Sequence, residues 1–222
     1  MLPEIGVIFD AGTGFFRVAA QLETDAVEIF LSHAHLDHIA GLTYFLVPLM
    51  NGSVKRARIH GKPETLEAVR KHLFATEVFP IEPAFDYVAL TETVSVPGNG
   101  ILTHIGLRHP GGSTGYRIDF QDRSMAYITD TTVDGSYDEF IRGVDLLIHE
   151  CYFPDSRSEW SEKTGHSHTS TVATLAKNAG VGRLLLVHID PTRPEDDPIG
   201  LDAARAIFPG TDLAEDRMTT EF

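Results

Sequence analysis

The chain has 222 residues, of which 42% are hydrophobic and 23% charged, and this balance excludes a disordered or fibrous protein. Its 18 lysines and arginines against 32 aspartates and glutamates give a formal charge of -14, which excludes broad, non-specific binding of nucleic acid. Cys151 is the single cysteine, so an internal disulfide and a zinc site built of thiolates are excluded as well.

The beginning of the chain has neither a basic segment nor a long apolar run. No stretch elsewhere approaches the roughly 18 apolar residues that a membrane span requires. We therefore expect one globular domain over residues 1–222, cytoplasmic and without contact to a membrane.

Short apolar runs rich in branched residues alternate with amphipathic stretches, which is typical of an α/β fold. Such runs predict strands at residues 5–9, 27–31, 58–60, 87–90, 101–107, 116–120, 125–129, 146–148 and 184–187. Helical spacing predicts a helix that begins at Pro63 and another over residues 172–179. The apolar run 45–50 predicts the buried end of a helix.

Four potential metal ligands crowd into the six positions 33–38, directly after an apolar strand. In so tight a loop, His33 and His35 can point to one metal ion while Asp37 and His38 point to a neighbouring one. A solvated polar loop is the alternative interpretation. Further donors favour the metal site, because His109, Asp130 and His188 also follow predicted strands, where sites of α/β folds assemble.

This pattern, His-x-His-x-Asp-His followed by a distant histidine, aspartate and histidine, resembles the metallo-β-lactamase superfamily over nearly the whole chain. The resemblance implies a four-layer αββα sandwich. About two strands that usually precede the turn at Asp10 are missing, so Met1 is an internal or misassigned start, or a partner chain covers the sheet edge in a homodimer.

The resemblance also implies how two metal ions would be held. The first ion would take His33, His35 and His109, and the second would take Asp37, His38 and His188. Asp130 would bridge both ions, and Asp10, in the turn before the loop, would orient ligands. Zinc suits these nitrogen and oxygen donors, although manganese, iron and cobalt do so too.

Three further segments resemble the ribonuclease Z branch of that superfamily: residues 109–117, 145–150 and 165–181. This likeness implies that His166 donates a proton to the leaving oxygen and that Glu150 holds His166. The catalytic residues expected are Asp37, Glu150 and His166. His168 competes with His166, because a shift of two residues in register would exchange their roles.

Transfer-RNA maturases of that branch carry a long arm between the positions of His109 and Asp130, whereas here a short hairpin through residues 121–123 is expected. Without the arm, and at a charge of -14, a small or cyclic nucleotide-type phosphodiester is favoured as substrate over extended nucleic acid. Three alternatives remain open: processing of precursor transfer RNA, hydrolysis of a lactone or thioester, and a metal-binding sensor without activity.

Three residues outside the proposed ligand set also have chemically versatile side chains. Trp160 is a candidate for stacking on a base, with ordinary packing as the alternative. Cys151 is expected to be a small buried residue rather than a nucleophile. His60 lies outside every ligand motif, so a satisfied surface or core position is expected for it.

Overall fold

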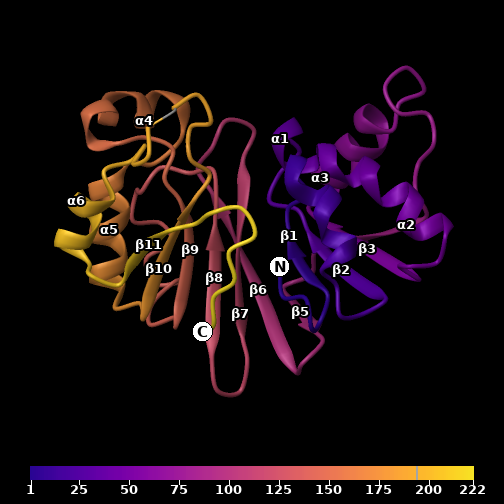
Figure 1. Cartoon of the computed structure of the whole chain (residues 1–222), viewed down its shortest axis with the longest axis horizontal. Coiled ribbons are helices and arrows are strands. Elements are labelled where there is room, and N and C mark those ends of the chain that lie inside the picture. The colour runs from indigo at the N-terminus through magenta and orange to yellow at the C-terminus, as the bar shows by residue number, and fades with distance from the viewer. Residues whose placement is uncertain (194) are drawn as a thin grey trace. The chain divides into compact units, whose positions relative to one another are not determined.

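The computed structural model describes residues 1–193 and 195–222, and the chain divides into two compact units, residues 1–101 and 102–222 (Figure 1). Each unit combines a β-sheet with helices, as expected for an α/β protein. The expectation of a single domain over residues 1–222 stays a prediction. Within the described residues, no helix combines the length and apolar character needed to cross a membrane.

Unit 1 contains a parallel sheet in the order β1-β2-β3-β4. Its strands are β1 (Val7–Phe9), β2 (Ala26–Phe30), β3 (Arg56–Gly61) and β4 (Phe85–Ala89). Strand β5 (Thr93–Val96) comes next in the chain and is not part of this sheet. In register, Ile29 lies opposite both Ile8 and Ile59, which builds one apolar face. Strand β1 begins two residues later than predicted, because Gly6 adopts a left-handed φ of 68° where the chain turns.

Helical segments of unit 1 pack on that apolar face. The α-helices are α1 (Leu36–Ile39), α2 (Leu46–Met50) and α3 (Pro63–Ala68), and α3 continues as a π-helical turn over Val69–Leu73. Short 3-10 helices span Thr13–Ala20 and Ala40–Phe45. As predicted, a helix begins at Pro63 and buries Leu66, Val69 and Leu73 in the core.

The expectation of a buried helix end over residues 45–50 holds for Phe45, which is 1% exposed, and is wrong for the rest of the run. Helix α2 has no buried residue, and Val47 and Met50 are 63% and 77% exposed. A helix of five residues points its side chains in all directions around the axis, so it cannot bury all of them. The core contact comes from Leu42 and Phe45, which are three positions apart at the end of the preceding 3-10 helix.

The strands of unit 2 lie in the order β11-β10-β9-β8-β7-β6, and the first two residues of β6 still belong to unit 1. They are β6 (Gly100–Leu107), β7 (Ser113–Asp119), β8 (Ser124–Ile128), β9 (Leu146–Glu150), β10 (Arg183–Val187) and β11 (Thr211–Leu213). Strands β7 and β8 form an antiparallel hairpin, and β8 to β11 run parallel. The predicted short connection between His109 and Asp130 is confirmed, since a turn at residues 120–123 joins β7 to β8.

The helices of unit 2 are α4 (Ser158–Thr164), α5 (Thr169–Ala179) and α6 (Leu201–Ile207), with a 3-10 turn at Asp155–Arg157. Helix α5 packs on the sheet through Val172 and Ala176, which meet Leu184 and Leu186 of β10 in one buried cluster. In parallel strands covered this way, continuous apolar runs are expected. The carboxyl ends of β8, β9 and β10 therefore carry the first polar residues, and these lead directly to the candidate site.

Candidate active site

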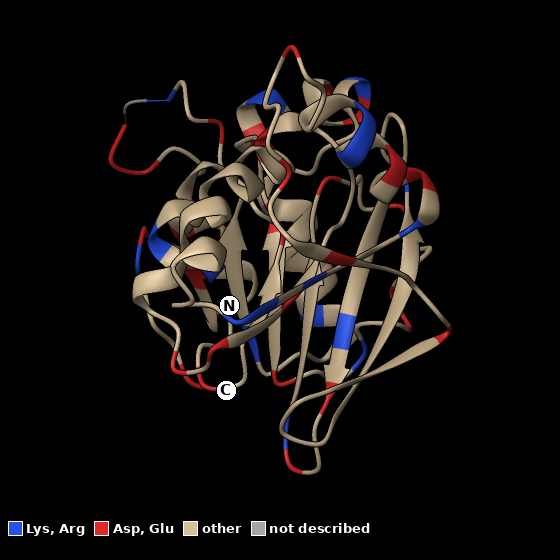
Figure 2. Ribbon diagram, turned by 90° about the vertical axis from the view of Figure 1, so that its right-hand side faces the viewer, with Lys and Arg blue, Asp and Glu red and all other residues tan. Residues whose placement is uncertain are grey.

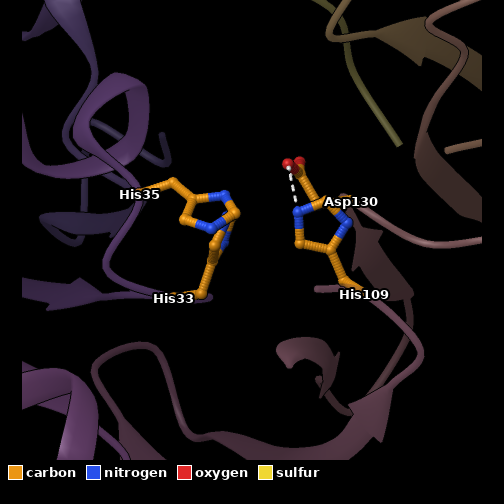
Figure 3. A group of neighbouring side chains, drawn as sticks. All are labelled: His33, His35, His109 and Asp130. Carbon is orange, nitrogen blue, oxygen red and sulfur yellow. Dashed lines mark ion pairs between the residues drawn. The ribbon is translucent and has the colours of Figure 1, made fainter. Parts of the chain in front are cut away.

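In unit 1, the loop between β2 and α1 brings three histidines together. The centroid of the His33 ring lies 4.3 Å from that of His35 (Figure 3). It lies equally far, 4.3 Å, from the centroid of the His38 ring. His33 and His38 are buried, whereas His35 and Asp37 are exposed. The three imidazoles thus form a compact cluster, and their role as metal ligands stays a prediction.

Asp10 fixes this cluster from the preceding turn. Its Oδ1 accepts a hydrogen bond from the backbone N–H of Ser32 at 2.7 Å. Its Oδ2 is 2.8 Å from both the hydroxyl of Ser32 and Nδ1 of His38. The hydroxyl of Ser32 also lies 2.9 Å from Nδ1 of His33. The expected orienting role of Asp10 therefore has a direct geometric basis, and its left-handed φ of 56° marks a constrained backbone.

The Asp10 turn and the ligand loop touch through their backbones. The N–H of Ala11 donates to the carbonyl of His38, and the N–H of Gly41 donates to the carbonyl of Ala11, both at 2.7 Å. A Cβ atom on Gly12 would lie 2.4 Å from the carbonyl oxygen of Asp37. Only glycine permits this approach, so the turn and the loop pack directly against each other.

In unit 2, the carboxylate of Asp130 lies between two imidazoles. Its Oδ2 is 3.6 Å from Nε2 of His109 (Figure 3), and its Oδ1 is 3.4 Å from Nε2 of His188. The hydroxyl of Thr129 donates to Oδ1 at 2.6 Å. Asp130 and His188 follow β8 and β10 with left-handed φ values of 49° and 54°, which non-glycine residues adopt mainly under tertiary constraint.

His109 is oriented by the end of helix α4. Its Nδ1 donates to the carbonyl of Gly165 at 3.0 Å. Gly165 has a left-handed φ of 80°, and a Cβ atom there would lie 2.6 Å from Pro110 and 3.1 Å from Nδ1 of His109. A larger residue at this position would clash with Pro110 and press on the imidazole.

Glu150, at the end of β9, is fully buried and accepts four hydrogen bonds. The donors are the backbone N–H groups of Thr131, Tyr152 and Ser167, at 2.9 to 3.2 Å, and Nδ1 of His166 at 3.0 Å. A carboxylate with all its donors in place is a rigid acceptor. Because Nδ1 of His166 donates to Glu150, Nε2 is the ring atom left for chemistry.

A buried tyrosine and a buried histidine, Tyr137 and His149, hold the backbone of β9 at Glu150. The hydroxyl of Tyr137 donates to Nε2 of His149 at 2.9 Å, and Nδ1 of His149 donates to the carbonyl of Glu150 at 2.7 Å. Burial lowers the pKa of His149 and raises the pKa of Tyr137, so both groups are neutral.

The two competing histidines have different surroundings. His166 has a ring nitrogen within 4.8 Å of ligand atoms of both Asp130 and His188. Nδ1 of His168 instead lies 2.8 Å from Asp155, which also accepts from the backbone N–H of Ser170 in the first turn of α5. His168 thus belongs to the start of α5, and His166 lies beside the donors of unit 2.

Sequence reasoning missed Ser32, Gly165 and Tyr152. The first two act through hydrogen bonds that no motif identifies, while the ring of Tyr152 stacks on His166 with centroids 4.7 Å apart. The one feature of the sequence that could have identified Tyr152 is its position two residues after Glu150. Cys151 is buried as expected, and burial raises the pKa of its thiol to about 12, which suits an inert side chain.

Comparison with known proteins supplies the wider context. The family model described as "Beta-lactamase superfamily domain" matches residues 6–189. A ribonuclease Z of Nostoc sp. is 43% identical, with 96% of this chain and 84% of the relative covered. A ribonuclease Z of Methanosarcina acetivorans is 40% identical, at 97% and 88% coverage. The metallo-beta-lactamase fold protein YhfI of Bacillus subtilis superposes with a TM-score of 0.77 at 23% identity, with 94% and 85% covered.

Proposed function

The chain belongs to the beta-lactamase superfamily, and from this premise we propose that it holds two metal ions and hydrolyses small phosphodiesters. The membership confirms two predictions made from sequence, the metallo-β-lactamase fold and a metal-dependent hydrolase of ribonuclease Z-like type. The number and identity of the ions, the residue roles and the substrate belong to the proposal.

The donor set fits divalent transition metals. In His33, His38 and His109, an oxygen of the protein holds Nδ1, so Nε2 is the ligand atom. Metal-binding histidines in proteins usually have their second nitrogen held in this way. Mixed imidazole and carboxylate donors suit Zn²⁺, and Mn²⁺, Fe²⁺ or Co²⁺ as alternatives.

We assign the ligands as the family resemblance implies. One ion takes His33, His35 and His109, and the other takes Asp37, His38 and His188, with Asp130 shared. The observation that carries this proposal is the Asp130 carboxylate, whose two oxygens face His109 and His188, one from each ligand set. Two ions so bound would lower the pKa of a water and neutralise charge on the phosphate oxygens.

His166 is proposed as the general acid. Glu150 holds its Nδ1, which leaves Nε2 to give a proton to the departing oxygen. The imidazole is partly exposed, as a group that meets substrate must be. Asp37 is exposed beside His38, with 3.5 Å between Oδ2 and Nε2, and we propose that it also orients the attacking water.

A small substrate is supported by charge and by the short β7–β8 hairpin. Figure 2 shows lysines and arginines as separate segments of the ribbon, interspersed with acidic ones, and the formal charge of -14 disfavours binding of an extended polyanion. Precursor transfer RNA is the second candidate, because a relative named ribonuclease Z is 43% identical. A homodimer and a cytoplasmic location stay predictions.

The test is a substrate panel on protein purified without added metal. We expect turnover of bis(p-nitrophenyl) phosphate and of a cyclic nucleotide, and none of a lactone or thioester. A strong chelator should abolish turnover, whereas omission of magnesium should not, since histidine-rich sites prefer transition metals. Full activity after chelation, verified by elemental analysis, contradicts the metal proposal. Cleavage of precursor transfer RNA at submicromolar enzyme would replace the small substrate by the second candidate.

A further inference from the structure

The segment from Tyr152 to Lys163 carries aromatic and cationic side chains that the proposed chemistry does not use. It leaves β9 just after Glu150, forms helix α4, and returns to the site at His166. All of it lies in unit 2. Its position next to the proposed general acid makes it the surface that the leaving part of a substrate would meet.

Trp160 is the exposed aromatic residue of this segment. The side chain is 43% exposed, although large aromatic residues contribute most when buried. Two cations lie over its ring: Nζ of Lys163 at 5.0 Å and Cζ of Arg157 at 5.9 Å from the centroid. Lys163 also lies 4.0 Å from Glu159, but both side chains are mostly exposed, so this ion pair is weak.

A continuous row of contacts joins Trp160 to the proposed general acid. Arg157 lies between two rings, because its Cζ is also 5.7 Å from the ring of Phe153. The ring centroid of Phe153 lies 6.5 Å from that of His166. The ring of Tyr152 stacks on the same imidazole. The row therefore leads outward from His166, with an exposed aromatic face at its far end.

Helix α4 holds Trp160 in a fixed position relative to His166. The backbone N–H groups of Gly165 and His166 both donate to the carbonyl of Ser161, at 3.0 and 2.9 Å. The carbonyl of Gly165 accepts from His109. The helix end is thus tied to a proposed metal ligand, and a rigid platform of this kind suits recognition.

We propose that Trp160, with Arg157 and Lys163, forms a subsite for the aromatic base of a nucleoside that is the leaving alcohol of the phosphodiester. The inference rests on the proposed function, because it takes the leaving side from the role of His166. An exposed indole offers a stacking face to any base, and the two cations attract the phosphate attached to it. A purely alkyl or aryl diester would leave this surface unused.

Binding is tested directly, since Trp160 is the single tryptophan of the chain. Adenosine 5′-monophosphate added to the metal-loaded protein should quench tryptophan fluorescence to saturation, and ribose 5-phosphate, which lacks the base, should not. No effect of the nucleotide, or equal effects of both compounds, overturns the subsite. The readout needs no turnover, so binding without any phosphodiesterase activity would refute the proposed function and leave the subsite standing.

Kinetics of variants supply the second test. Trp160→Ala should raise the KM for 2′,3′-cyclic AMP by about 5- to 150-fold, the range that follows from loss of base stacking. Trp160→Phe should stay within a few-fold of wild type. The KM for methyl p-nitrophenyl phosphate should change in neither variant. Equal losses on both substrates would assign Trp160 to packing and overturn the proposal.

Phe120→Ala is the matched control. Phe120 also lies under an arginine, with Cζ of Arg123 at 5.2 Å, but it belongs to the β7–β8 turn. Within unit 2, that turn lies at the opposite end of the strands from α4 (Figure 1). Both substrates should keep their KM in this variant, and a selective loss for the nucleotide would contradict the assignment to Trp160.

Discussion

The two units contribute proposed ligands in different ways. In unit 1, His33, His35, Asp37 and His38 come from a single loop, and Asp10 in the neighbouring turn holds it. In unit 2, His109, Asp130 and His188 come from the ends of strands β6, β8 and β10, and successive donors are 21 and 58 residues apart along the chain.

This difference separates local from tertiary organisation. The loop of unit 1 is a short segment whose spacing alone limits where its side chains can go. The donors of unit 2 meet because β8, β9 and β10 are parallel neighbours, so their carboxyl ends lie at one edge of the sheet. We expect loss of a strand-end residue to affect chemistry most, and loss of a supporting residue to affect affinity or stability.

The largest effect is expected for Asp130→Ala. As the shared ligand it serves both proposed ions, and its loss also exposes two cations to mutual repulsion. The value of kcat/KM should fall by about 10⁴-fold, more than for His33→Ala in the loop of unit 1. Metal content by elemental analysis should fall as well. Two ions retained with near-normal turnover would refute the shared ligand.

His166→Ala should be selective for the leaving group. A cyclic nucleotide expels an alkoxide that needs a proton, so its turnover should fall by about 10²- to 10⁴-fold more than that of bis(p-nitrophenyl) phosphate. Glu150→Gln should show the same selectivity for the leaving group to a smaller extent. His168→Ala should show no such selectivity, because the imidazole of His168 pairs with Asp155. A leaving-group effect confined to His168→Ala would exchange the two roles.

Asp10→Asn probes the support of the loop in unit 1. Its carboxylate holds Ser32 and His38, and loss of such a supporting group typically costs about 10- to 100-fold in metal affinity. Equilibrium dialysis against zinc measures this. Asp155→Asn alters a comparable aspartate–histidine pair outside the ligand set and should leave affinity unchanged. Equal losses in both variants would point to general destabilisation.

The smallest effect concerns His149, which supports the strand end in unit 2. Burial lowers its pKa below 6.5, so below that pH the unfolded chain takes up a proton that the folded chain does not. The free energy of unfolding therefore falls with falling pH, by up to about 1.4 kcal/mol per pH unit. Urea titrations between pH 5 and 8 should show a shallower fall for His149→Gln. An unchanged slope would mean that His149 is protonated when folded.

The sequence by itself determined the fold class, and it supplied the proposed metal ligands and their order. The spacing at residues 33–38 needs no tertiary information, because neighbours in a tight loop cannot be far apart. Branched apolar runs likewise located most strands, since burial on both faces of a parallel strand leaves few polar positions. The prediction for the run 45–50 held only at Phe45, because apolar composition does not state which side of a short helix meets the core.

Only the tertiary structure decided which histidine lies beside Asp130 and what holds it. His166 and His168 are two residues apart and equally plausible by type, but only His166 reaches Glu150, which comes from another strand. The same holds for Gly165, whose carbonyl orients His109 from 56 residues away. Hydrogen bonds between residues so far apart in the chain depend on strand order and backbone direction. The spacing of residues within one segment predicts neither of these.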